Sequence, residues 1–154
     1  MSDNSMTKEA VTCAIRHIGT GIYSSGKIRE YLIRKGYSED VAASAVKHLT
    51  ETGYIDDMRA SRKVLTARSG KKQESRQYIF KRLLEAGIDD GCADEIVNSL
   101  GNDIDTCLSL FKAFFGDDAD ASEREEEFIK LAGLRGYSQE TARTALKLYS
   151  DSSK

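Results

Sequence analysis

The residues of this sequence that most often carry chemistry are two adjacent aspartates and two histidines. Asp56 and Asp57 could supply the neighbouring carboxylates that general acid and base catalysis needs. No histidine or other base accompanies them at a useful spacing, and His17 and His48 belong to no nucleophile or metal cluster. We therefore predict that the aspartates begin a helix, one of them as its N-cap, and that the histidines have surface or packing roles.

The three cysteines, Cys13, Cys92 and Cys107, are far apart and form no C-x-x-C pair. A zinc site needs clustered thiolate and imidazole ligands, so we expect free thiols and no metal. The sequence also lacks a phosphate-binding lysine loop, a G-x-G-x-x-G and an H-E-x-x-H motif. No apolar run approaches the ~20 residues needed to span a bilayer, and the N-terminus has no signal-peptide pattern. These absences predict a cytoplasmic protein that is not an enzyme, holds no cofactor and does not enter a membrane.

The formal net charge is only −2, but the charges are distributed very unevenly. Residues 59–82 contain nine Lys or Arg and one acid, whereas residues 85–127 contain fourteen acids and two bases. Such runs also arise as solvated helix faces, and the acidic one could equally meet a basic partner. A dense basic segment attracts phosphates or acidic protein loops. We predict that its cations form the partner-binding site: Arg59, Arg62, Lys63, Arg68, Lys71, Lys72, Arg76, Lys81 and Arg82.

The elements that must position these cations are helices. Apolar residues recur at helical spacing in nine stretches, and no window alternates as a strand would. In a helix over residues 57–69, the spacing places Ala60, Val64 and Ala67 inward and Arg59 outward. Few aromatic residues lie among the cations, Tyr78 being the exception, which argues against a platform that stacks single-stranded bases. The nine apolar stripes fall at residues 11–18, 28–32, 41–49, 60–67, 79–86, 92–100, 104–115, 128–132 and 142–149.

Proline is absent, and glycines lie between the predicted helices. Eight of the twelve glycines fall into three series with spacings of 46 to 51 residues: Gly36, Gly87 and Gly136; Gly19, Gly70 and Gly116; Gly53 and Gly101. Glycine just after a helix adopts the left-handed conformation that ends it, and the apolar residue that follows, such as Tyr54, can cover the last turn. We predict an all-α fold of three-helix repeats at residues 7–53, 54–101 and 102–150, stacked into an elongated, curved body.

Three motifs occur in order along this frame: L-T-E-T-G-Y-I-D-D at residues 49–57, a G…I…L…GI frame over 70–88, and L-R-G-Y-S at 134–138. In this order and spacing they resemble the RecX family, bacterial regulators of the RecA recombinase, over residues 7–149. The chain departs from the family pattern at Ala60 and Ser61, where an aromatic and then a small residue are usual, and in its heavy acidic run.

The resemblance implies a monomeric, non-enzymatic protein of DNA repair and the SOS response. It would bind the RecA–DNA filament and inhibit or modulate the ATPase, strand-exchange and co-protease activities of RecA, with DNA contacted through the filament or directly. Two alternatives stay open from the residues themselves. One is a nonspecific nucleic-acid binder that uses residues 59–82, and the other is a helical adaptor for an unrelated partner.

Overall fold

The computed structural model describes residues 2–152, with side chains from residue 4 onward. This part of the chain contains nine α-helices and one short 3-10 helix, and none of it forms a strand. The predicted all-α fold class is therefore confirmed. The elements are α1 (Ser2–Ile18), α2 (Ser25–Arg34), α3 (Glu39–Glu51), α4 (Asp57–Ala67), η1 (Gly70–Lys72), α5 (Arg76–Glu85), α6 (Asp90–Ser99), α7 (Asp103–Phe115), α8 (Ala121–Leu134) and α9 (Gln139–Ser152).

Glycines end the helices at nearly all of the predicted positions. Seven of the eight glycines in the three series have a positive φ, and Gly101 is the one at which the prediction is wrong. After α3, the backbone N–H groups of Gly53 and Tyr54 donate to carbonyls of the last turn at 3.2 and 2.9 Å. Tyr54 does not cover that turn, because 48% of it is exposed and the next residue, Ile55, enters the core instead.

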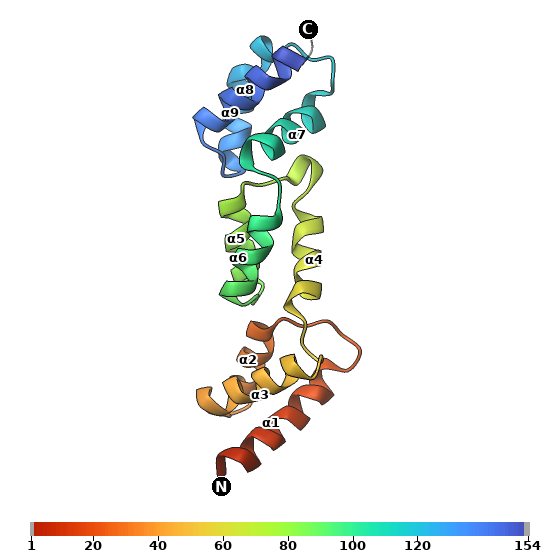
Figure 1. Cartoon of the computed structure of the whole chain (residues 1–154), viewed down its shortest axis with the longest axis vertical. Helices are drawn as coiled ribbons and strands as arrows, with labels where there is room; N and C mark the ends of the chain where they lie inside the picture. The colour runs from red at the N-terminus through yellow and green to blue at the C-terminus, as the bar shows by residue number, and fades with distance from the viewer. Residues whose placement is uncertain (1, 153–154) are drawn as a thin grey trace. The chain divides into compact units, whose positions relative to one another are not determined.

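Residues up to 63, together with residues 83–94, form the first of two compact units. In this unit α1, α2 and α3 pack around one apolar core, and Figure 1 shows them grouped near the N-terminus. The helices can approach closely because small residues alternate with large ones along their inner faces. The buried core consists of Ala10, Ala14, Ile18, Ile28, Leu32, Val41, Ala42, Ala45, Leu49 and Ile55.

Residues 64–82, together with residues from 95 onward, form the second compact unit. Its core lies among α7, α8 and α9 and is built around aromatic rings. The ring of Phe111 meets Phe128 edge-on at 5.1 Å and Tyr149 at 4.7 Å between centroids. Such T-shaped pairs stabilise a core by about 0.5–1.5 kcal/mol beyond the area that they bury. The predicted repeat boundaries and the stacked arrangement of the repeats stay predictions.

All three cysteines are free thiols, and Cys107 is fully buried in the second core. Burial, with a smaller contribution from the charge of Asp103, raises the pKa of the Cys107 thiol to about 12. The folded-state pKa lies above the unfolded value, so ionisation of the Cys107 thiol opposes folding. The contribution of the neutral, buried thiol to stability is therefore present at neutral pH and is lost as the pH rises toward 12.

We expect Cys107 to react with iodoacetamide at pH 8 at least ~100-fold more slowly than the half-buried Cys13 and Cys92, because only the thiolate attacks. Mass spectrometry of peptides from a time course of the native chain measures the three rates. Similar rates for all three thiols would contradict the burial of Cys107.

Candidate partner-binding site

One face of α4 carries three of the predicted site residues. Arg59, Arg62 and Lys63 are exposed and are spaced three and four residues apart, so they project from the same side of the helix. Among the residues that the structure describes, none of the three forms an ion pair. Like charges at this spacing repel one another slightly, so this face gains from an anion that a partner supplies.

The opposite face of α4 differs from the prediction. Ser61 is the buried residue of this helix, 2% exposed, and its hydroxyl donates to the carbonyl of Met58 at 2.6 Å. Ala67, which was predicted to face inward, is exposed, and α4 ends there rather than at residue 69. Ala60 and Val64, the other two residues predicted to face inward, are half-buried, so the prediction is wrong at Ala67 and missed the burial of Ser61. A serine fits this position because its own helix satisfies its hydroxyl.

The two aspartates before this face have structural roles. Asp56 caps α4, since its carboxylate accepts the backbone N–H of Arg59 at 3.1 Å, which confirms the predicted N-cap. Asp57 accepts the backbone N–H and the hydroxyl of Ser25 at 2.7 and 2.6 Å, and the backbone N–H of Asp89 at 2.9 Å. The Asp57 carboxylate thus joins α2, α4 and the segment that precedes α6.

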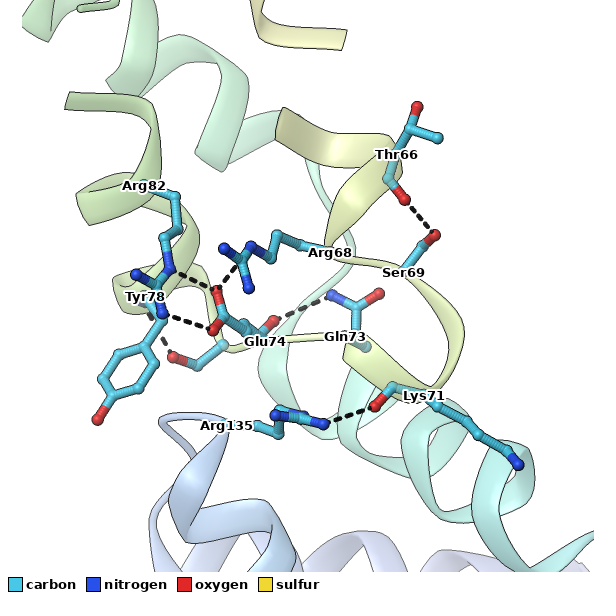
Figure 2. Close-up of polar contacts among 10 residues, drawn as sticks. Thr66, Arg68, Ser69, Lys71, Gln73, Glu74, Tyr78, Arg82 and Arg135 are labelled. Atoms are coloured by element: carbon cyan, nitrogen blue, oxygen red, sulfur yellow. Dashed lines mark hydrogen bonds and ion pairs between the residues drawn. The ribbon is translucent and has the colours of Figure 1, made fainter. Parts of the chain in front are cut away.

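The predicted site residues Arg68 and Arg82 converge on a buried carboxylate (Figure 2). Glu74, the only acid of the basic segment, is 3% exposed. Arg82 donates to both of its oxygens at 3.3 and 3.2 Å, and Nε of Arg68 lies 3.9 Å from one of them. A forked guanidinium contact of this kind fixes both side chains. These two cations therefore hold the segment before α5 in place.

A third predicted site residue, Arg76, also has an internal partner. Its guanidinium donates to the carbonyls of Leu100 and Gly101, just after α6. Its backbone N–H donates to the carboxylate of Asp103 at 2.9 Å, at the start of α7. A cation beside the carbonyl end of a helix is electrostatically favourable. Arg76 thus connects α5 with the α6–α7 turn.

The remaining site residues of the second unit, Lys71, Lys72 and Lys81, are exposed. The ammonium of Lys71 lies 5.6 Å above the ring of Phe114, which is itself 37% exposed. The segment around Lys71 gives no sign of this aromatic neighbour, because Phe114 lies on another helix. The pair of adjacent phenylalanines on α7 is the available signal, since both cannot face one core.

Tyr78, the aromatic exception in the basic segment, is not available for base stacking. It is half-buried, and a Cβ at Gly136 would come within 2.6 Å of its ring. The neighbouring Arg135 donates to the carbonyl of Lys71 at 3.1 Å, as Figure 2 shows. The tyrosine therefore belongs to the packing between α5 and the turn before α9.

Replacing Glu74 with alanine is expected to lower the free energy of unfolding of the second unit by roughly 1–2 kcal/mol. The loss is smaller than the roughly 3–5 kcal/mol of a completely buried pair because about one third of each arginine side chain is exposed. Urea denaturation measures it, with the exposed Glu123→Ala on α8 as the control. An equal effect of both changes would show that the Glu74 pairs contribute nothing.

The structure describes neither a membrane-spanning helix nor a metal cluster within residues 2–152. No helix there is long and apolar enough to cross a membrane. No group of three or more His, Cys, Asp or Glu side chains in the described part is arranged to hold a metal ion. His17 stacks on the ring of Tyr31 with centroids 3.7 Å apart, which is a packing role of the kind predicted.

Known proteins resemble this chain both in sequence and in fold. The family model described as RecX, first three-helix domain, matches residues 10–49. A Regulatory protein RecX from Pelodictyon phaeoclathratiforme is 26% identical over 149 residues, which cover 97% of this chain and 82% of the relative. Another from Prosthecochloris aestuarii is 23% identical over 146 residues, which cover 95% of this chain and 96% of that one. In sequence, the chain resembles the RecX family over nearly its whole length.

A solved structure resembles this chain in its fold. The crystal structure of RecX from Lactobacillus salivarius matches with a TM-score of 0.68 and 13% sequence identity, over 96% of this chain and 98% of that one. The relatives are named regulatory proteins. The family model ends at residue 49, before the basic segment, so the assignment of the nine cations to a binding site stays a prediction.

Proposed function

We propose that this chain is a regulatory protein of the RecX family, which binds the RecA–DNA filament and inhibits or modulates the ATPase, strand-exchange and co-protease activities of RecA. The similarity to the RecX family carries the proposal, because relatives that match nearly the whole chain are named regulatory proteins. The exposed cations support it, since a protein filament on nucleic acid presents phosphates and acidic side chains.

The structure divides the nine predicted cations into two groups. Arg68, Arg76 and Arg82 have internal partners and would position the contact surface rather than form it. The exposed members would meet the partner, because a cation that forms no ion pair within the described part of the chain gains the most from an external anion. They are Arg59, Arg62 and Lys63 in the first unit and Lys71, Lys72 and Lys81 in the second.

The rate of ATP hydrolysis by RecA on single-stranded DNA tests the proposal. The chain is added at substoichiometric amounts to RecA, and we expect the rate to fall as its concentration rises. An unchanged rate at every ratio would remove RecA modulation as the function. Recovery of a different protein in stoichiometric amounts by pull-down, without RecA, would favour the adaptor alternative.

Direct binding to nucleic acid is a second candidate, and the three cations on one face of α4 favour it. Three neutralised phosphates of duplex DNA would give a slope of about −2.7 for the logarithm of the binding constant against the logarithm of salt concentration. Fluorescence anisotropy of a labelled duplex at several salt concentrations measures this slope. Binding that is absent at low salt, or that does not change with salt, would exclude this candidate.

Reversing the charge of Arg59 and Arg62 to glutamate separates the two candidates. We expect inhibition of RecA to require about tenfold more of this variant, because its carboxylates repel the anions that the arginines would attract. The matched control reverses Lys130 and Lys147, which are exposed on α8 and α9 and lie outside the basic segment. If inhibition falls while binding to naked DNA is unchanged, the filament is the target; equal losses in both assays favour DNA.

A further inference from the structure

A groove of about 1040 Å³ lies within the first compact unit, and none of the nine cations of the basic segment lines it. Residues of α2 and α3 line one part of it, and the first turn of α4 and the segment 84–92 line the rest. Two hydrogen bonds fix these parts relative to one another: Gly26 donates to the carbonyl of Gly87 at 2.8 Å, and Ser25 donates to Asp57. These hydrogen bonds therefore hold the segments that line the groove in a fixed arrangement within this unit.

Apolar side chains are exposed within this groove. Met58 is 52% exposed and Leu84 is 38% exposed, and both line it together with the half-buried Val46 and the buried Ile55 and Ile88. Large aliphatic side chains that stay exposed around a concave surface mark interaction sites. A methionine suits such a site because its flexible, polarisable side chain adapts to the partner.

The rim of the groove is acidic. Two lining residues are basic, Arg29 and Lys47, and six are acidic, Glu30, Glu51, Asp56, Asp57, Asp89 and Asp90, which gives a net charge of −4. Asp57 is engaged with Ser25, but the side chains of Glu51 and Asp90 form no ion pair or hydrogen bond within the described part of the chain. This field repels phosphates, so a nucleic acid is not the occupant that it favours.

We propose that this groove binds a short amphipathic, cationic segment of a partner protein, whose aliphatic side chains contact Met58 and Leu84 and whose Lys or Arg side chains meet Glu51 and Asp90. An amphipathic helix with anchors three and four residues apart is the usual occupant of a groove with an apolar floor. The acidic rim selects the charge of that helix and sets its register. The surface differs from the basic one proposed above, and the groove stands whether or not RecA is the partner.

The test is binding of a fluorescein-labelled amphipathic helical peptide to the full chain. The probe has about twelve residues, with leucine at every third and fourth position and lysine elsewhere. We expect saturable binding that weakens about tenfold or more in the double variant Glu51→Lys, Asp90→Lys, because attraction at the rim becomes repulsion. The matched control, Glu123→Lys with Glu126→Lys, changes exposed acids of α8 outside the groove and should bind within twofold of the unchanged chain.

Two changed probes test the other parts of the proposal. A peptide with its lysines replaced by glutamate should not bind, and one with its leucines replaced by serine should bind at least ~10-fold more weakly. No saturable binding of the original probe up to about 1 mM, or equal binding by the Glu51/Asp90 variant, overturns the proposal. Equal binding of the serine peptide also overturns it, because the interaction would then be purely ionic. Circular dichroism confirms that each variant is folded.

Discussion

Replacing Gly87 with alanine is expected to lower the free energy of unfolding of the first compact unit by roughly 2–5 kcal/mol. Gly87 has a φ of 84°, in the left-handed region where a Cβ costs about 1–2 kcal/mol. The same Cβ would lie 2.4 Å from the Ser24 hydroxyl and 2.9 Å from the backbone nitrogen of Lys27. Relieving these overlaps requires the start of α2 to move, which costs roughly 1–3 kcal/mol more.

Two other glycines separate these contributions. Gly53 has a φ of 86° but no atom within 4 Å of the position of a Cβ, so Gly53→Ala should cost only the conformational part, about 1–2 kcal/mol. Gly133 lies inside α8 with an unremarkable φ and open space around it, so Gly133→Ala should stabilise the chain by about 0.5–1 kcal/mol. Native-state hydrogen exchange measures the change in each unit separately. A loss at Gly87 no larger than that at Gly53 would show that the close approach to Ser24 has no energetic consequence.

The contact at Gly87 recurs in the second unit. A Cβ at Gly136, with a φ of 92°, would lie 2.5 Å from the Ser75 hydroxyl. In both units the serine oxygen accepts the backbone N–H three residues later, at 3.3 Å for Ser24 and 3.2 Å for Ser75. The two serines are 51 residues apart and the two glycines 49. The spacing of about 50 residues thus corresponds to a repeated structural contact. In each case a serine that caps the start of a helix lies against a glycine in a turn.

The helices and their glycine turns could be predicted from the sequence because their causes are local. A positive φ at Gly36 follows from the need to end α2 within a few residues, whatever surrounds it. The inner face of α4 was harder to predict because three alanines or valines at helical spacing fit more than one register. The burial of Ser61 depends on which elements pack against α4, and periodicity does not contain that information.

The basic segment shows why charge patterns alone do not define a site. Nine cations look equivalent in the sequence, but Glu74 is buried and holds Arg68 and Arg82. A single acid among many bases is the signal that could have indicated this, since a lone carboxylate attracts several of them. The exposed ring of Phe114 beside Lys71 depends on a contact between segments 43 residues apart, which no local pattern reveals.

Replacing Asp57 with alanine is the second change for which we expect a large loss of stability, roughly 2–4 kcal/mol in the first unit. Its carboxylate accepts three hydrogen bonds, two from Ser25 and one from the backbone of Asp89. Hydrogen bonds to a charged acceptor contribute about 1.5–3 kcal/mol each. The total is smaller than their sum because water can replace the carboxylate at the exposed N–H of Asp89.

The neighbouring Asp56 provides a matched control for this change. Asp56→Ala removes the same charge one residue earlier but only one capping bond, to Arg59, so it should cost about 1 kcal/mol. In a double-mutant cycle with Ser25→Ala, Asp57→Ala should show a coupling of about 1 kcal/mol and Asp56→Ala none, because only Asp57 contacts the Ser25 hydroxyl. Hydrogen exchange should also lose protection at Ser25 in the Asp57 variant alone. Equal effects of the two aspartates would mean that both act only through the charge at the start of α4, and that the Asp57 carboxylate does not hold α2 against the segment before α6.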